Sequence, residues 1–364
     1  MYRYDGTQWL EEQKLAPGAL QVLDGFGCQV AISGNVILAG AHGGDPGGVQ
    51  DAGEVYVFRY NGTQWVEEQV LSASDKAVGD QFGPVAVSGN LAVVGAGLAD
   101  MPGGFNEGAA SVFRFNGTQW VEEQKLTASD AAISDEFGRF VATDGTTILI
   151  GAPSADVAGN GDSGAVYAYA FDGTQWVEEK ITPANSTISG AFGATMDIDG
   201  DKALIGARDK AYVFRHNGQS WVEQEALDSS DGHASDGFGA PVSLSDTKGI
   251  VGAALMNGSG AACLFSMPDL ALSTNLATVM PGDALSFFTC GGRLTAPVGL
   301  FLVDANGALI FLPIEFGLFD GSGQWTKPAT VPPGLAGLSA EFLSMGFIQP
   351  MKVGLSDQVA VTFQ

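Results

Sequence analysis

The chain has 364 residues, of which 45% are hydrophobic and 52 are glycine, and its formal net charge is −25. This length exceeds the roughly 100–200 residues usual for one domain, so we expect two structural units. Because Asp and Glu outnumber Lys and Arg by 41 to 16, the chain lacks the basic footprint that nucleic acids require, and we exclude that class of partner. No apolar run is long enough for a membrane-spanning helix, and residues 1–6 do not have the pattern of a signal peptide.

Five copies of one unit follow each other from the start of the chain. Each copy contains a tryptophan that follows a turn: Trp9, Trp65, Trp120, Trp176 and Trp221. Each also contains a Phe-Gly pair, which begins at Phe26, Phe82, Phe137, Phe192 and Phe238. A Gly-Ala pair comes next, at Gly40, Gly95, Gly151, Gly206 and Gly252. Three features in a fixed order, five times over, indicate a repeat protein.

One unit contains four predicted strands, which the second copy shows clearly. Residues 82–88 and 91–96 are apolar and are separated by Gly89-Asn90. After a Gly-rich loop, residues 110–115 and 120–126 flank Asn116-Gly117, a pair typical of a tight hairpin. Small residues on the first strand and charged residues on the last predict a wedge-shaped sheet, as in a propeller blade.

The same residues carry a family resemblance. Phe137-Gly138 followed by Gly151-Ala152-Pro153 resembles the FG-GAP repeat of integrin-type propellers, in a form similar to bacterial members of that family. The resemblance covers residues 1–266, although only this copy keeps the Pro. It implies an all-β propeller fold, with the long loops after each Gly-Ala pair gathered on one face.

The fifth copy lacks a Trp-containing outer strand before the chain changes character at Met267. Residues 8–15 have the pattern of such a strand, so we predict five four-stranded blades in a ring that the N-terminal strand closes. Residues 2–4, however, resemble the end of a third strand. The alternative is therefore a segment of a longer array, or a strand lent to a neighbouring molecule.

Residues 269–364 no longer show the repeat and form a second predicted domain. Their strands are expected at 284–290, 298–303, 308–314, 324–329, 338–343 and 359–363. This number of short strands in about 95 residues favours an immunoglobulin-like β-sandwich.

Catalytic residues are not evident in the repeats. Propeller hydrolases place two or more acids on the innermost strands, whereas only Asp197 occurs on these strands here. The histidines lie in separate turns or loops without a neighbouring nucleophile. We therefore predict a protein without enzymatic activity.

Two loops are candidates for binding Ca²⁺, which integrin-type repeats often hold. The roomier one offers Asp156, Asn160 and Asp162 between flexible glycines, with a solvated loop as the alternative. The weaker one offers Asp197, Asp199 and Asp201, where a plain hairpin explains the pattern without a metal.

Two smaller features complete the pattern. The acids Asp24, Asp80, Asp135 and Asp236 each stand two residues before a Phe-Gly pair, where we expect them to cap their own turns by bonding the backbone two residues on. Cys28, Cys263 and Cys290 are interpreted as buried free thiols, with a disulfide between Cys263 and Cys290 as the alternative.

These observations predict an extracellular or cell-surface protein that binds a protein or glycan ligand through the propeller loops. The second hypothesis is a structural subunit of an extracellular assembly or filament, which would associate with itself.

Overall fold

The computed structural model describes residues 1–18, 21, 23–101, 104–228, 237–245, 248–254 and 260–266, and the backbone of four strands between residues 298 and 362. The chain divides into two compact units near Asp269. Within the described part, no helix is long and apolar enough to cross a membrane.

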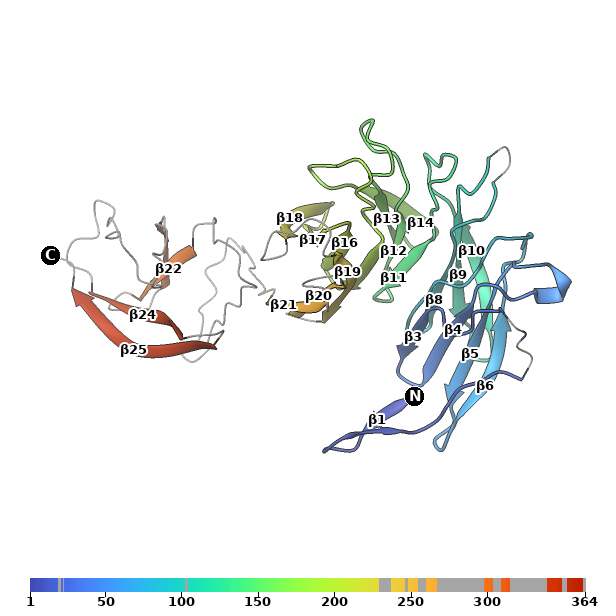
Figure 1. The fold of residues 1–364 in the computed structure, drawn as a ribbon, viewed down its shortest axis with the longest axis horizontal. Helices are drawn as coiled ribbons and strands as arrows, with labels where there is room; N and C mark the ends of the chain where they lie inside the picture. The colour runs from blue at the N-terminus through green and yellow to red at the C-terminus, as the bar shows by residue number, and fades with distance from the viewer. Residues whose placement is uncertain are drawn as a thin grey trace. The chain divides into compact units, whose positions relative to one another are not determined.

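Four sheets of four antiparallel strands make up most of the first unit, as the repeat predicts (Figure 1). Blade 1 consists of β3 (Val30–Ser33), β4 (Val36–Ala41), β5 (Glu54–Tyr60) and β6 (Trp65–Leu71). Blade 2 consists of β7 (Val85–Ser88), β8 (Leu91–Ala96), β9 (Ala109–Phe115) and β10 (Trp120–Leu126). Blade 3 consists of β11 (Phe140–Thr143), β12 (Thr147–Ala152), β13 (Ala165–Phe171) and β14 (Trp176–Ile181). Blade 4 consists of β15 (Thr195–Asp199), β16 (Lys202–Ala207), β17 (Lys210–His216) and β18 (Trp221–Asp228).

Local chemistry explains the strand order inside a blade. All six residues of β8 are buried, which suits a strand covered on both faces, whereas β10 buries chiefly Trp120 and Leu126 at its ends. In the hairpin between β9 and β10, Oδ1 of Asn116 accepts hydrogen bonds from the backbone N–H groups of Thr118 and Gln119, both at 3.0 Å. This bonding fixes the turn and hence the register of the two strands.

Successive blades pack through their inner strands, with β3 against β7, β7 against β11, β11 against β15 and β15 against β19 (Phe238–Ser245). Between blades 1 and 2, Val85 and Val87 join one buried cluster with Val36 and Leu38. A separate apolar cluster of this kind lies between each pair of successive blades.

The Phe-Gly and Gly-Ala pairs meet across each boundary between blades. A Cβ atom on Gly40 would lie 2.1 Å from the carbonyl oxygen of Gly83, and one on Gly95 would lie 1.9 Å from that of Gly138. The same close approach joins Gly151 to Gly193 and Gly206 to Gly239. No side chain fits on the first glycine of these four contacts, which explains the glycine of the Gly-Ala pair.

The two ends of the array correct one prediction. Blade 5 has three strands, β19, β20 (Lys248–Ala253) and β21 (Ala261–Ser266), and no fourth strand pairs with β21 among the described residues. The N-terminal strand β2 (Trp9–Glu11) pairs instead with β1 (Tyr2–Tyr4), so the predicted closure of the fifth blade is wrong in this structure. A local hairpin costs much less loop-closure entropy than pairing with a strand some 250 residues away.

The second unit contains β22 (Val298–Val303) paired with β23 (Leu309–Ile314), and β24 (Ser339–Ile348) paired with β25 (Lys352–Thr362). These strands confirm the β structure predicted at 298–303 and 308–314, and they contain most of the residues predicted at 338–343 and 359–363. The strands predicted at 284–290 and 324–329 lie outside the described residues, and the sandwich stays a prediction.

Candidate functional site

The loops that follow the Gly-Ala pairs lie at the same end of each sheet as the segments that lead into the next blade. Antiparallel pairing requires this arrangement, because both connections join that end of the strands. We call this surface the loop face and define it by loops 42–53, 97–108 and 153–164 with segments 72–81, 127–136 and 182–191. Figure 1 shows that its loops project beyond the ends of the strands.

Each of these loops is closed by one recurrent hydrogen bond. The backbone N–H of Asp51 donates to Oδ1 of Asp45 at 2.8 Å, and that of Asn106 donates to Oδ1 of Asp100 at the same distance. In blade 3 the N–H of Asp162 donates to Oδ1 of Asp156 at 2.9 Å. The Asp side chains therefore fix the shape of the loops.

Each loop is also bonded to the next blade. The N–H groups of Phe82, Phe137 and Phe192 donate to the carbonyls of Ala52, Glu107 and Ser163 at 2.9, 2.9 and 3.0 Å. Three residues before each of these phenylalanines, the N–H groups of Gly79, Ser134 and Ser189 donate to the carbonyls of Gln50, Phe105 and Gly161. Backbone hydrogen bonds on the loop face consequently tie neighbouring blades together at three blade boundaries.

Two residues of the first predicted Ca²⁺ loop form structural hydrogen bonds. Asp156 caps the loop as described, and Nδ2 of Asn160 donates to the carbonyl of Ser186 at 3.1 Å. No cluster of three His, Cys, Asp or Glu side chains suited to a metal occurs among the residues that the structure describes. Ca²⁺ binding by Asp156, Asn160 and Asp162 stays a prediction.

The three carboxylates of the second predicted Ca²⁺ site have separate surroundings. Oδ2 of Asp197 accepts bonds from the N–H of Leu244 at 2.8 Å and from Oγ of Ser243 at 3.0 Å, so it ties blade 4 to blade 5. Asp201 forms an ion pair with Arg215 at 2.6 Å. Asp199 ends β15 and is exposed. This site also stays a prediction.

The recurrent acids before the Phe-Gly pairs are structural caps, but they act in the opposite direction along the chain from the prediction. Oδ2 of Asp80 accepts the N–H of Ala77 at 2.7 Å, and Oδ2 of Asp135 accepts that of Ala132 at 2.9 Å. Both side chains are buried, and burial raises the pKa of each carboxyl above its usual value. Asp24 makes the same bond to Gln21, whereas Asp236 lies outside the described residues.

A row of exposed aliphatic side chains crosses the loop face. Val78, Ile133 and Ile188 are 71, 67 and 72% exposed, and each stands four residues before a Phe-Gly phenylalanine. Phe105, 58% exposed, lies beside Ile133 because its carbonyl accepts the N–H of Ser134 at 2.9 Å. We call these four residues the apolar row. The apolar row was not predicted from the sequence, although the recurrence of a β-branched residue at this position was the signal.

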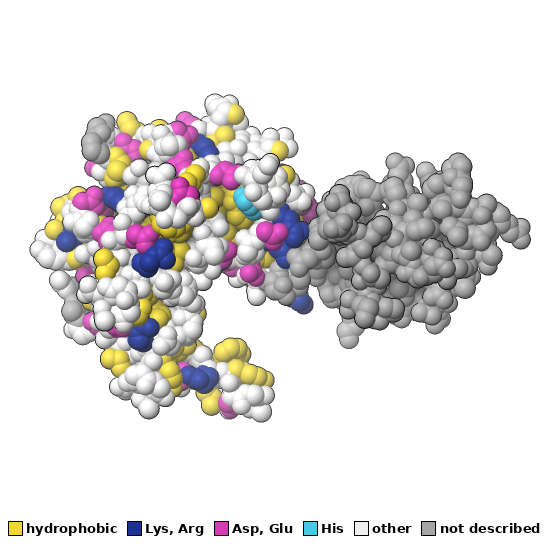
Figure 2. Space-filling view, turned by 180° about the vertical axis from the view of Figure 1, so that it is seen from behind, with side chains coloured by type: hydrophobic (Ala, Val, Ile, Leu, Met, Phe, Trp, Pro, Cys, Tyr) yellow, Lys and Arg dark blue, Asp and Glu magenta, His cyan; other side chains and the backbone are white. Residues whose placement is uncertain are grey.

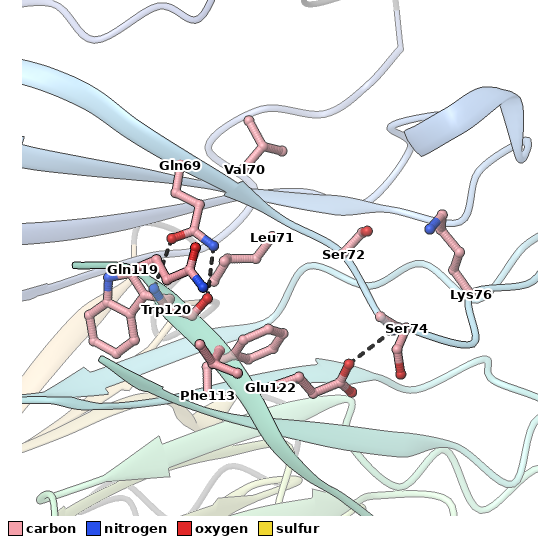
Figure 3. Close-up of a pocket in the computed structure, with 12 residues that line it drawn as sticks. Gln69, Val70, Leu71, Ser72, Ser74, Lys76, Phe113, Gln119, Trp120 and Glu122 are labelled. Carbon is pink, nitrogen blue, oxygen red and sulfur yellow. Dashed lines mark hydrogen bonds between the residues drawn. The ribbon is translucent and has the colours of Figure 1, made fainter. Parts of the chain in front are cut away.

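A shallow groove between the outer strands β6 and β10 is a structural contact (Figure 3). The side-chain amide of Gln69 donates to the carbonyl of Trp120 and accepts its N–H, both at 2.8 Å. Nearby, the N–H of Ser74 donates to Oε2 of Glu122 at 3.0 Å. These bonds join blades 1 and 2 at the rim.

Charged side chains are spread over the surface of the first unit. On the face drawn in Figure 2, acidic side chains are interspersed with apolar ones, and the fewer basic side chains lie beside them. Two basic residues of the outer strands form ion pairs with the preceding blade, Lys125 with Asp75 at 2.7 Å and Lys180 with Asp130 at 2.6 Å.

The cysteines differ from the prediction at one position. Cys28 is exposed, since none of the described residues forms a blade against the first strand of blade 1. Cys263 is buried, as predicted, while Cys290 and any disulfide that it forms lie outside the described residues.

Comparison with known protein families matches the FG-GAP repeat to residues 9–58, 65–113, 120–169 and 221–265, which together make up more than half of the chain. The chain belongs to the FG-GAP repeat family. Each matched FG-GAP repeat begins at a Trp, on the outer strand of a blade in three of the four matches, and ends in the third strand of the following sheet. The sequence repeat is therefore offset from the blade by one strand. The unit that begins at Trp176 lies outside the matched FG-GAP stretches, although its strands form sheets like the others.

Proposed function

We propose that this chain is a non-enzymatic, extracellular or cell-surface binding protein whose loop face takes a protein ligand. The observation that carries the proposal is the apolar row, in which equivalent exposed side chains recur at successive blades. Aliphatic side chains gain free energy when an apolar partner surface covers them. A single exposed apolar residue needs no explanation, whereas exposed apolar residues at the same position of three successive blades are the feature that we take as an interaction site.

The rigidity of the loop face supports the same function. Its loops are closed by Asp side chains and bonded to the next blade, so little backbone ordering is needed when a ligand binds. A preorganised surface loses less entropy on binding than a mobile one. The net charge of −25 adds a preference for ligands with basic residues around the apolar contact.

Separate observations support the part of the proposal that the protein is not an enzyme. Asp197 is the single acid on the predicted inner strands, and its carboxylate holds the backbone of blade 5. Glycans are the less favoured ligand class, because sugar rings usually stack on aromatic side chains and Phe105 is the one aromatic member of the apolar row.

The proposal is tested with two matched variants and two ligand libraries. The loop variant carries Val78→Asp, Ile133→Asp and Ile188→Asp. The rim variant carries Val66→Asp, Val121→Asp and Val177→Asp, which change three outer-strand residues that are 41, 42 and 47% exposed in the same region of the array. Wild-type protein is used to select binders from a displayed peptide library and from a glycan array.

We expect peptides with apolar and basic residues to be selected, and to bind the rim variant as tightly as wild type. The loop variant should bind them about 100-fold more weakly, since three lost apolar contacts of about 1 kcal/mol each act together. Thermal unfolding checks that both variants are folded. Selection of glycans alone, equal losses in both variants, or no binder in either library would contradict the proposal.

A further inference from the structure

The two ends of the blade array carry the two halves of one interface. At four boundaries the glycine of a Gly-Ala pair lies against the glycine of the next Phe-Gly pair. The remaining glycines are Gly27 in blade 1 and Gly252 in blade 5. No atom lies within 4 Å of a Cβ placed on Gly27, and the three atoms nearest to a Cβ on Gly252 belong to Pro241 and Ala240 of its own blade.

The free face of blade 1 is apolar and exposed. Val30 and Ile32 of β3 are 67 and 55% exposed. Their counterparts in β7, by strand register, are Val85 and Val87, which are 5 and 8% exposed because they pack on blade 1. Blade 1 therefore presents the surface that each later blade uses to contact its predecessor.

The free face of blade 5 is the complementary surface. Ile250 and Leu264 pair across β20 and β21, and they are 44 and 46% exposed. Their counterparts in blade 1 are Leu38 and Val57, which pair in the same way and are completely buried in the cluster shared with blade 2.

Strand β2 has the side chains of an outer strand, although it lies outside any four-stranded sheet. Tyr4 and Trp9 stack with ring centroids 5.5 Å apart at 47°, and Tyr60 and Trp65 stack at 5.4 Å and 48°. Just after β2, Gln13 donates to the carbonyl of Trp65 and accepts its N–H, both at 2.8 Å, as Gln69 does with Trp120. Segment 9–13 therefore sits on blade 1 as the outer strand of a preceding blade would.

We propose that a second copy of this chain supplies the preceding blade. In this head-to-tail contact, β2 of one copy exchanges its β1 partner for β21 of the other copy and becomes the fourth strand of that blade 5. Val30 and Ile32 then cover Ile250 and Leu264, and Gly27 meets Gly252. The chain makes this same interface at each internal boundary, and an unpaired apolar sheet edge is a template for another strand.

The exchange replaces a weak pairing with a stronger one. β1 has three residues, all exposed, whereas β21 has six. Trp9 is 69% exposed beside β1, while Trp65, Trp120 and Trp176 are 5, 3 and 6% exposed in complete blades. Pairing with β21 would bury Trp9 between two blades and so gain apolar burial that the β1–β2 hairpin lacks.

Site-directed cross-linking tests the proposed partner. The register of β5 and β6 places Arg59 opposite Val66, and the equivalent pair in the proposed contact is Ser266 opposite Leu10. One protein carries Leu10→Cys and another carries Ser266→Cys, both with Cys28→Ser to remove the exposed thiol. We expect oxidation of the mixture to give a covalent dimer that neither protein forms alone. No dimer in the mixture would overturn the proposal.

A protein with both new cysteines in one chain distinguishes a second copy from closure within one copy. Head-to-tail contact predicts a covalent ladder on a non-reducing gel, whereas a cross-linked monomer would mean that the chain closes on itself and would overturn the proposal. In sedimentation experiments without cross-linking, Leu264→Asp should weaken self-association at least ~10-fold. Val121→Asp, at a similarly exposed site on β10, should leave it unchanged, and equal effects of both would also contradict the contact.

Discussion

The carboxyl group of Asp80 shows how single residues fix the repeat. It is buried at the start of blade 2 and accepts one backbone N–H, from Ala77. Asp24 and Asp135 make the same bond in the neighbouring blades, while Gly190 stands at this position in blade 4, where a backbone bond to Thr187 closes the turn. The carboxyl group therefore stabilises the turn. Burial disfavours its charged form and so raises its pKa, which is an electrostatic cost.

This cost predicts a pH-dependent effect of Asp80→Asn. The folded-state pKa of Asp80 lies above the unfolded one, so its stabilisation is present at low pH and is lost as pH rises through the folded pKa. The Asn amide keeps the acceptor and has no charge. We expect the free energy of unfolding of Asp80→Asn to rise relative to that of wild type as the pH increases from about 4 to about 7. Urea denaturation measures both values.

Two further variants complete this experiment. Asp80→Ala removes the acceptor and should be about 1 kcal/mol less stable than Asp80→Asn at neutral pH. Asp51→Asn is the matched control for the change of an Asp to an Asn, because an Asn, Asn106, already occupies the equivalent position in blade 2. A constant difference between Asp80→Asn and wild type across this pH range would show that the carboxyl is not penalised by burial.

At the scale of elements, the outer strands join the blades at the rim. Gln69 on β6 bonds both backbone groups of Trp120 on β10, and Glu179 on β14 accepts the N–H of Trp221 on β18 at 2.7 Å. Gln69 stands four residues after Trp65 of its own strand, whereas Glu179 stands three residues after Trp176. The extra residue in β6 is accommodated by a register shift against β5 that β14 does not have against β13. A bulge therefore lets strands of different length present the same bond.

This bond predicts the effect of Gln69→Ala. The substitution removes two hydrogen bonds and leaves the backbone of the buried Trp120 without these partners, so we expect a loss of about 1–3 kcal/mol in the free energy of unfolding. Gln119→Ala is the matched control, since Gln119 lines the same groove with an exposed side chain (Figure 3). Urea denaturation followed by tryptophan fluorescence compares the two, and equal stabilities would contradict the role of this bond.

The sequence was sufficient to predict the elements wherever local signals repeat. Asn116-Gly117 and its counterparts mark the hairpins, and the Phe-Gly and Gly-Ala pairs bracket the two inner strands. The contact between Gly95 and Gly138 was not predictable, because it joins two blades and leaves no local signature beyond the absence of a side chain. The pairing of β2 was predicted wrongly, since its residues suit an outer strand equally well beside β1 or β21.

The candidate site was harder to predict, because it also depends on contacts between residues that are far apart in the sequence. Asp156 and Asp162 were proposed as calcium ligands from composition, but their hydrogen bond recurs at Asp45 and Asp51, where it closes a loop. Val78 and Ile133 are β-branched residues of a kind usually expected in a core, so their exposure emerges only when the blades are assembled.

At the scale of the whole molecule, the described blades form an array in which the loops of blades 1, 2 and 3 hold the Phe-Gly segment of the next blade. Both proposals depend on this arrangement. It makes the loop face continuous, which suits a ligand that spans several blades, and it leaves the first Phe-Gly segment, at Phe26, without a preceding loop. Phe26 is correspondingly half-buried, whereas Phe82, Phe137, Phe192 and Phe238 are at most 1% exposed.

Hydrogen exchange measured by mass spectrometry on dilute protein tests this arrangement most directly. The amides of Phe82, Phe137 and Phe192, which are bonded to the preceding loops, should exchange slowly, and peptides around Phe26 should exchange at least ~10-fold faster. At concentrations where copies associate head to tail, the Phe26 peptides should become protected as well. Equal protection of all four segments in dilute solution would contradict an array whose first blade is open.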